Sequence, residues 1–277
     1  MEAELTPNGQ KVFSLYKYVS LASPARKQHA RAIFERDAVW LASPTSFNDP
    51  FDCKFVLSFC ASTKAKKQMY YQYLTDPKGL QLPREVALKK MKELFSPSRP
   101  NAQRRLQAWE QDRRSHLMKV RETLPVLCLT ELNDHILMWA HYADCHRGIC
   151  LEFRFDLDEH LQLLLSFHRV RYQQEFPRLN FYTTPWGGPK FTLMALTKSE
   201  HWAYEKEWRW IDHGGPGERP LPTRMLWAVI LGAQMPREDR MEVLQWNAAR
   251  THPLRVHQAR LRKTEYGLDI ERVDTSR

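Results

Sequence analysis

The sequence predicts an α+β fold, in which a mostly antiparallel or split β-sheet core is flanked by helices and carries a helical insert. Short segments rich in β-branched and aromatic residues indicate strands, and segments with apolar residues at helical spacing separate them. A chain of 277 residues with 43% hydrophobic content has enough apolar surface for one sizeable core. We therefore expect a single domain over residues 1–277.

The first strand is expected at residues 12–19 (VFSLYKYV) and the first helix at residues 25–36. Further strands are expected at residues 38–41, 126–130, 148–155, 169–172, 201–211, 226–231 and 254–261. Further helices are expected at residues 134–143, 192–199 and 237–250. The order of strands and helices is irregular, which is typical of α+β proteins.

The helical insert is expected at about residues 64–123, because this stretch has amphipathic helical segments and no strand signal. Prolines at positions 77, 83, 97 and 100 divide it into separate helices.

The composition bounds the compartment and the class of partner. The N-terminal residues MEAELTPNGQKVF carry charges and a proline where a secretory signal needs an apolar run, so we expect a cytoplasmic protein with no membrane segment. The odd number of cysteines, five, indicates free thiols in a reducing compartment. A formal net charge of +10 favours the approach of polyanions such as nucleic acids or nucleotides.

The first candidate motif is SPTSFNDPFD, residues 43–52, which follows a predicted strand. Asn and Asp side chains bond nearby backbone N–H groups in such turns, and prolines stiffen them. The motif is therefore either a structural Asx turn or a rigid loop that presents Asn48, Asp49 or Asp52 to a ligand.

The second candidate motif is LMWAHYADCHRG, residues 137–148. On a helix, His141 and Cys145 share one face, so one stripe packs in the core and the other is open to a site. The spacing of the Cys and His residues matches no common zinc pattern, and we expect no metal site. His141 and Tyr142 are candidates for ligand contact or proton transfer.

The third candidate motif is WAYEKEWRW, residues 202–210. Period-2 alternation over one strand places the aromatic residues on one face and Glu205, Glu207 and Arg209 on the other. If that face is solvated, the row is a surface ion pair of small energetic value. If it faces a cleft, Arg209 holds one carboxylate ionised and the row has the character of a catalytic base or cation stabiliser.

These segments together resemble a bacterial family, domain of unknown function 2971. The resemblance is carried by LYKY at residues 15–18, the SPTSFNDPFD block that ends at Asp52, the block from Cys128 to Phe153, and the block from Lys198 to Arg209. It extends from residue 12 to about residue 265. The family itself implies no activity.

The order of elements is also similar to that of ADP-ribosyltransferases, which bind NAD in a split β-sheet. This resemblance implies an NAD-dependent transferase, a toxin or a phage-defence effector, with a nucleic-acid or protein acceptor. Its catalytic residues would be Glu205, Glu207 and His141. Its ligand-binding residues would be Tyr16, Lys17, Tyr18, Ser43, Asn48, Asp49, Asp52, Trp139, Tyr142 and Arg209. The first-strand Arg of those enzymes is absent, and Lys17 is the nearest basic residue.

Two other functions stay open at this point. Basic residues interleaved with aromatic ones, as in KAKKQMYYQYL at residues 64–74, are compatible with a non-catalytic module that binds nucleic acid or nucleotides. A solvated helical face is the commoner explanation of such a segment. A hydrolase that uses the Asp, His and Glu residues without NAD is the other alternative.

Overall fold

A computed structural model describes residues 4–5, 11–77, 79–96, 101–185, 188–212, 214–222 and 224–273. The chain forms two compact units. The sheet unit comprises Met1–Ser46, Leu124–Val170 and His201–Arg277, and the helical unit comprises Phe47–Thr123 and Arg171–Glu200. The helical unit contains the predicted insert, and the folding of both units as one domain stays a prediction.

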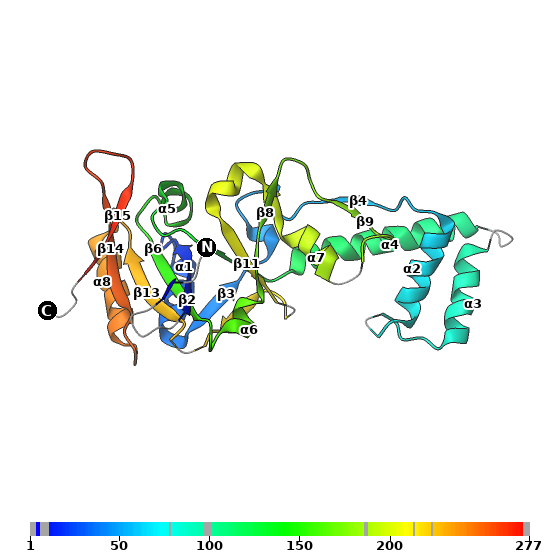
Figure 1. The fold of residues 1–277 in the computed structure, drawn as a ribbon, viewed down its shortest axis with the longest axis horizontal. Helices are drawn as coiled ribbons and strands as arrows, with labels where there is room; N and C mark the ends of the chain where they lie inside the picture. Colours follow the sequence, from blue (N-terminus) through cyan, green and yellow to red (C-terminus); the bar gives the residue numbers. More distant parts are fainter. Residues whose placement is uncertain are drawn as a thin grey trace. The chain divides into compact units, whose positions relative to one another are not determined.

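The sheet unit is built on one mixed, mostly antiparallel sheet, for which nine strands are described, in the order β15-β14-β13-β6-β2-β5-β11-β7 with β1 beside β2 (Figure 1). Its strands are β1 (Glu4–Leu5), β2 (Lys11–Val19), β5 (Val126–Thr130), β6 (Ile149–Asp156), β7 (Phe167–Arg169), β11 (Glu207–Ile211), β13 (Leu226–Leu231), β14 (Arg255–Leu261) and β15 (Leu268–Arg272). Strands β13 and β14 are parallel, whereas the other neighbours are antiparallel. The described strands form an open sheet and not a barrel, and the predicted α+β class is confirmed.

One face of this sheet carries the main apolar core. Leu15, Leu129 and Leu151 are buried there because alternate residues of a strand point to the same face. Helices α1 (Pro24–Arg36) and α8 (Arg237–Ala248) contribute to the same core. The opposite face carries a second apolar cluster around Trp139 of helix α5 (Ile136–Tyr142).

Several short elements complete the sheet unit. Strands β3 (Ala38–Leu41) and β12 (Gly217–Pro220) pair with each other as a separate ribbon. Two single-turn elements, η1 (Pro44–Ser46) and α6 (Leu161–Leu164), lie in the connections, and a longer 3₁₀ segment, η2 (Glu200–Glu205), precedes β11.

The helical unit contains the predicted helices of the insert, α2 (Thr63–Thr75), α3 (Arg84–Phe95) and α4 (Ala102–Thr123). Figure 1 shows α2 beside α3, with α4 as the longest helix of this unit. Two parallel strand pairs join them, β4 (Val56–Ser58) with β9 (Arg178–Asn180) and β8 (Arg171–Gln173) with β10 (Thr197–Ser199). Two of the prolines expected to divide the insert, at positions 97 and 100, lie outside the described residues.

Two predicted elements outside residues 201–211 are wrong in detail. The single strand expected at residues 169–172 is divided at Val170 between β7 and β8, which belong to different sheets. The helix expected at residues 192–199 is α7 (Gly188–Ala195), and residues 197–199 form β10 instead. In both places the pairing partner, which lies far away in sequence, decides the conformation.

No helix of the described chain is both long enough and apolar enough to cross a membrane.

Trp109 organises the interior of the helical unit. Its ring lies 5.1 Å from that of Tyr70 and 5.5 Å from that of Phe181, between ring centroids. We expect Trp109→Ala to lower the free energy of unfolding by about 3 kcal/mol, because the aromatic contacts are lost and a cavity remains. Urea unfolding followed by circular dichroism measures this. The matched control, Tyr266→Ala, changes a side chain that is 100% exposed, and a similar loss there would contradict the assignment.

Candidate functional site

The strand predicted at residues 201–211 begins only at Glu207. Residues 200–205 form η2, and Lys206 has a positive φ of 44°, a left-handed conformation that cannot continue a strand. Thr130 at the end of β5 donates its hydroxyl hydrogen to the backbone carbonyl of Glu205. The prediction was therefore wrong for residues 201–206 and confirmed for residues 207–211.

Within β11 the two faces alternate as predicted. Trp208 and Trp210 pack against the main core, while Glu207 and Arg209 point to the opposite face. That opposite face is not solvated, because Glu207 is 5% exposed and Arg209 is 0% exposed. The surface ion-pair interpretation of this row is therefore wrong.

Glu207 and Arg209 form a bidentate ion pair. The Nε atom of Arg209 donates to Oε1 of Glu207 at 2.7 Å, and Nη2 donates to Oε2 at 3.0 Å. Residues two apart on a strand share a face, so this geometry follows directly from the extended backbone of β11. Both carboxylate oxygens of Glu207 are thus held by one guanidinium.

Lys17 and Cys128 lie beside this pair. The Nζ atom of Lys17 donates to the backbone carbonyl of Cys128 at 3.4 Å. Burial lowers the pKa of Lys17, and the charge of Glu207 opposes this shift. Burial also raises the pKa of the Cys128 thiol, and Glu207 adds to that effect. Burial therefore disfavours the thiolate form of Cys128.

Glu205 is held at both ends. Glu205 is only 2% exposed, and its Oε1 atom accepts a hydrogen bond of 2.6 Å from the Tyr142 hydroxyl. Its backbone carbonyl accepts from Thr130. The structure therefore brings together Tyr142 of α5, Glu205 of η2 and Thr130 of β5. Sequence reasoning did not single out Thr130, although a hydroxyl residue directly before Glu131 at the end of a buried strand was a usable signal.

Aromatic side chains lie around this group. The ring of Trp202 is 6.0 Å from that of His141, and the ring of Tyr204 stacks on His135 at 5.1 Å. His141 is exposed on α5. This gives the predicted catalytic histidine an aromatic neighbour within the same unit.

Other predicted residues of the sheet unit make packing contacts. Trp139 is 0% exposed and lies 5.1 Å from the ring of Tyr18. The Tyr18 hydroxyl donates to the backbone carbonyl of Leu132 at 3.0 Å. The hydroxyls of Ser43 and Thr45 are 2.7 Å apart. Ligand contacts by Tyr16, Tyr18, Ser43 and Trp139 stay predictions.

The SPTSFNDPFD motif adopts the predicted Asx turn. Oδ1 of Asp49 accepts from the backbone N–H of Phe51 at 2.8 Å, and Oδ1 of Asp52 accepts from that of Cys53 at 2.7 Å. Oδ2 of Asp52 lies 3.7 Å from Nζ of Lys198, and both side chains are buried. Asn48 is exposed. These residues belong to the helical unit, so a shared site with Glu205 stays a prediction.

The described residues contain no group of three or more His, Cys, Asp or Glu side chains arranged to hold a metal ion. All five cysteines are free thiols, with Cys53 and Cys150 buried and Cys60 and Cys145 exposed.

A second buried cation lies in the helical unit. Lys190 is 3% exposed, and its Nζ atom donates to the backbone carbonyl of Phe181 at 2.9 Å. Burial lowers the pKa of Lys190 to about 8.

Comparison with known proteins identifies one family. Residues 138–210 match the model of the family described as "Protein of unknown function (DUF2971)", which confirms the predicted family resemblance. This segment includes Tyr142, Glu205, Glu207 and Arg209. No curated protein and no solved structure matches the chain.

We expect Glu207→Gln to lower the free energy of unfolding by about 3–5 kcal/mol, because the buried guanidinium of Arg209 loses the negative charge that binds it through two hydrogen bonds. Urea unfolding of the two proteins measures the difference. The matched control is Glu218→Gln, which breaks the exposed pair with Arg36 and should cost less than about 1 kcal/mol. Equal losses in the two variants would show that burial of the Glu207–Arg209 pair has no energetic consequence.

We expect the stability of the wild type relative to Lys190→Met to increase as the pH rises from about 8 to 10.5. Below this window Lys190 is charged in both states, so the folded protein carries the full cost of burying the ammonium. Within the window the folded state releases its proton first, which recovers up to about 3 kcal/mol. Chemical unfolding at several pH values measures the trend, with the exposed Lys64→Met as control. A constant difference across the window would contradict it.

Proposed function

We propose that the chain is an NAD-cleaving glycosyl transferase similar to ADP-ribosyltransferases, and that Glu205 is its acting carboxylate. The observation that carries this proposal is the 2.6 Å hydrogen bond from Tyr142 to a buried glutamate that stands two residues before a second glutamate. A buried, oriented carboxylate in a low-dielectric environment is suited to stabilise positive charge.

The two glutamates differ in what holds them. Both oxygens of Glu207 are engaged by Arg209, so its charge is neutralised locally. Oε1 of Glu205 accepts a hydrogen bond from the Tyr142 hydroxyl. We assign the reacting carboxylate to Glu205, because both oxygens of Glu207 are already bound by Arg209, and we give Glu207 the role of orienting Arg209.

The chemistry fits these roles. Cleavage of the bond between nicotinamide and ribose releases neutral nicotinamide and leaves an oxocarbenium-like cation at the ribose carbon, which a fixed carboxylate stabilises. An acceptor nucleophile then forms the new bond to that carbon and gives its proton to a carboxylate. Lys17, which lies beside the Glu207–Arg209 pair, is the proposed contact for the pyrophosphate of NAD.

The proposed setting is the bacterial cytoplasm, where NAD is a soluble metabolite and free thiols persist. The five free cysteines support this setting. A nucleic acid or a protein is the proposed acceptor, and His141, exposed beside Trp202, is the proposed acid–base group on the acceptor side.

A non-catalytic nucleotide-binding module is the second candidate. It is favoured by the burial of both glutamates, since 2% and 5% exposure are also what a structural charge cluster requires. Binding of a nucleotide without turnover, with strong dependence on salt, would support this module. Turnover of another substrate without NAD would support a hydrolase instead.

We expect Glu205→Gln to reduce nicotinamide release from NAD by about 10²-fold or more, because the swap removes the negative charge and keeps the shape of the side chain. The Tyr142 hydroxyl still has an oxygen acceptor in this variant, so the hydrogen bond that orients residue 205 is kept and the variant should still fold. Chromatographic measurement of nicotinamide, together with urea unfolding, tests both parts.

The matched control for this experiment is Glu131→Gln. The Glu131 carboxylate follows Thr130 in the sequence, accepts a hydrogen bond from Trp208 and forms an ion pair with Arg169. Its nicotinamide release should stay within a few-fold of the wild type. Absence of NAD binding and of nicotinamide release in the wild type would remove the transferase proposal. Equal activity of Glu205→Gln and wild type would remove the role of Glu205.

A further inference from the structure

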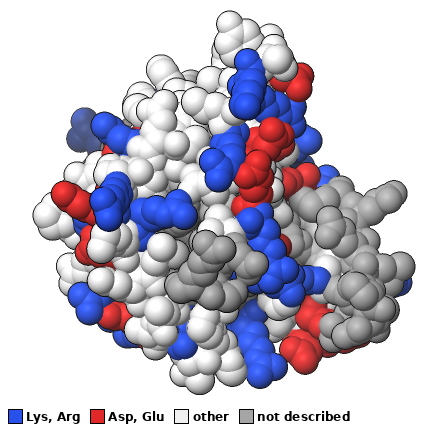
Figure 2. All heavy atoms as spheres, turned by 90° about the vertical axis from the view of Figure 1, so that its left-hand side faces the viewer, with Lys and Arg blue, Asp and Glu red and all other residues white. Residues whose placement is uncertain are grey.

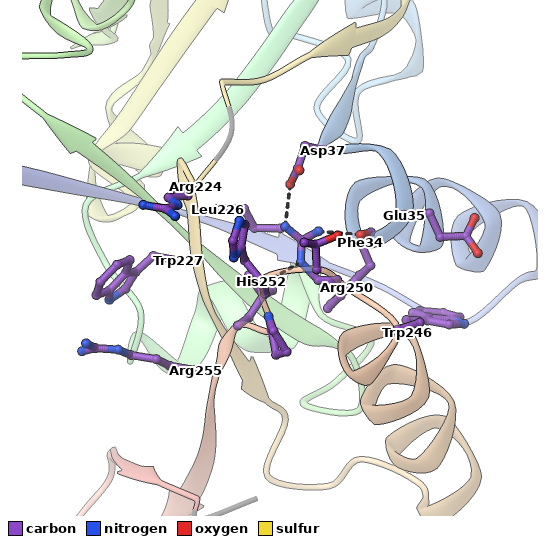
Figure 3. A pocket seen from close by; sticks show the side chains of 14 residues that line it. Phe34, Glu35, Asp37, Arg224, Leu226, Trp227, Trp246, Arg250, His252 and Arg255 are labelled. Atoms are coloured by element: carbon purple, nitrogen blue, oxygen red, sulfur yellow. Dashed lines mark hydrogen bonds and ion pairs between the residues drawn. The ribbon is translucent and has the colours of Figure 1, made fainter.

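A cleft of about 700 Å³ lies in the sheet unit, where three segments meet (Figure 3). These segments are the end of α1 from Phe34 to Asp37, the start of β13 from Arg224 to Trp227, and the connection from α8 to β14 over residues 249–255. None of them belongs to the motifs that the sequence analysis selected.

One wall of the cleft is a fixed structural contact. Nη2 of Arg250 donates to Oδ1 of Asp37 at 2.6 Å, and Nη1 donates to the backbone carbonyls of Ile33 and Phe34 at the end of α1. Figure 3 shows this pairing between the two segments. Arg250 therefore caps a helix end and is not available to a ligand.

Another part of the cleft is built around Trp227. This residue sits at a register shift between β13 and β6, which turns its indole onto the side chains of the neighbouring strands. The guanidinium carbon of Arg154 on β6 lies 4.4 Å from the ring centroid, and that of Arg255 on β14 lies 4.2 Å from it. β6 and β14 flank β13 on its two sides, so two guanidinium groups are held by one indole.

Stacking on an indole fixes the plane of a guanidinium and leaves the N–H groups along its edges able to donate. Arg224 adds a third guanidinium, with a backbone φ of 70°. In Figure 3, Arg224, Trp227 and Arg255 lie along one side of the cleft, and Glu35 lies on the other.

The charges of these three arginines are not balanced by acids. Among the described residues, Arg154, Arg224 and Arg255 make no ion pair with a carboxylate, whereas Glu35 pairs with Arg31 and Asp37 pairs with Arg250. The neighbouring Arg260 on β14 shows the contrast, because it pairs with Glu271. Guanidinium groups held near one another repel, and a multiply charged anion removes this repulsion.

We propose that Arg224 and Arg255, which line the cleft at Trp227, form a binding site for a small molecule that carries two or more linked phosphates, with Arg154 stacked on the same indole behind them. Planar guanidinium edges match phosphate oxygens in bidentate fashion, and several of them together favour an oligophosphate over a single carboxylate. The cleft volume of about 700 Å³ is in the range of small-molecule sites.

This site is separate from the one around Glu205. Along one row of the sheet, Arg255 pairs with Ala228, Ala228 with Glu152, Glu152 with Tyr16, Tyr16 with Thr130, and Thr130 with Glu207. Five strand spacings separate the two ends of this row, which is roughly 24 Å. One NAD molecule does not bridge both sites, so the inference goes beyond the proposed function.

A general basic surface is not the source of the proposal. On the face shown in Figure 2, Lys and Arg side chains occur in several groups, with Asp and Glu among them. The feature that favours a small oligophosphate is the arrangement of unpaired guanidinium groups at Trp227. A long polyanion binds to charge spread along a surface and does not require this arrangement.

Isothermal titration calorimetry with inorganic tripolyphosphate tests the site. We expect the wild type to bind one tripolyphosphate per chain. Arg224→Gln and Arg255→Gln should each weaken binding by about tenfold or more, because a charge-assisted contact is lost. The matched control, Arg260→Gln, should stay within about twofold of the wild type, since Arg260 lies on the same strand and already has an acidic partner.

Thermal unfolding of each variant reports whether it folds. Arg224 is exposed and has no described ion pair, so Arg224→Gln keeps the test informative if Arg255→Gln does not fold.

Absence of tripolyphosphate binding by the wild type would overturn the proposal, and so would an equal loss in Arg260→Gln. Single-stranded RNA that binds at the same residues tenfold more tightly than tripolyphosphate would overturn the small-molecule class. Nicotinamide release by Arg224→Gln stays at the wild-type level in either case, which separates this site from the proposed transferase site.

Discussion

The ion pair between Glu207 and Arg209 is the constraint on which the rest of the polar face of the sheet depends. A guanidinium that is 0% exposed has lost its hydration, and only a charged partner with good geometry compensates for that loss. The bidentate contact requires both residues on one face of a strand, which fixes β11 in extended form from Glu207 onward. β5 and β7 then pair with β11 on its two sides and hold it in register.

The turn before this strand gives the two glutamates different surroundings. Lys206, with its positive φ, ends the 3₁₀ segment and directs Glu205 away from the ladder of β11. Thr130 links the parts, because its hydroxyl donates to the carbonyl of Glu205 and accepts from the backbone N–H of Leu132 at 3.1 Å. Glu207 thus binds the guanidinium of Arg209 through both oxygens, and Glu205, two residues earlier, accepts from the phenol of Tyr142. Pairs of acids that are separated in this way are typical of sites in which each has its own role.

Much of the fold could be predicted because the local signals agree with the tertiary structure. The apolar alternation of residues 12–19 and the apolar run of residues 126–130 correspond to β2 and β5. The strand at residues 201–206 was predicted wrongly because the alternation of Trp202, Tyr204 and Glu205 is accidental there. The contacts made by Glu205 come from Thr130, to its backbone carbonyl, and from Tyr142, to its side chain, which lie 75 and 63 residues earlier. β15 has only two apolar residues in LDIER, so the exposed edge of β14 determines that strand and no local signal does. The burial of Arg209 could not be predicted from the sequence either, because a strand with charged residues at alternate positions is typical of a sheet with one face in solvent.

The formal charge of +10 has different consequences in different places. Around Glu205 and Glu207, Lys17 and Arg209 are matched by the two carboxylates, so this cluster contributes little net field, and its effect on a ligand depends on contact. Around Trp227, the guanidinium groups have no acidic partner in the described chain, so their field extends into solvent over about one Debye length, roughly 8 Å at physiological salt. Long-range attraction of anions and short-range charge stabilisation are therefore performed by different parts of one sheet. The net charge alone suggested polyanion binding. It could not show which part of the sheet attracts anions at long range, because that depends on which arginines are paired with acids.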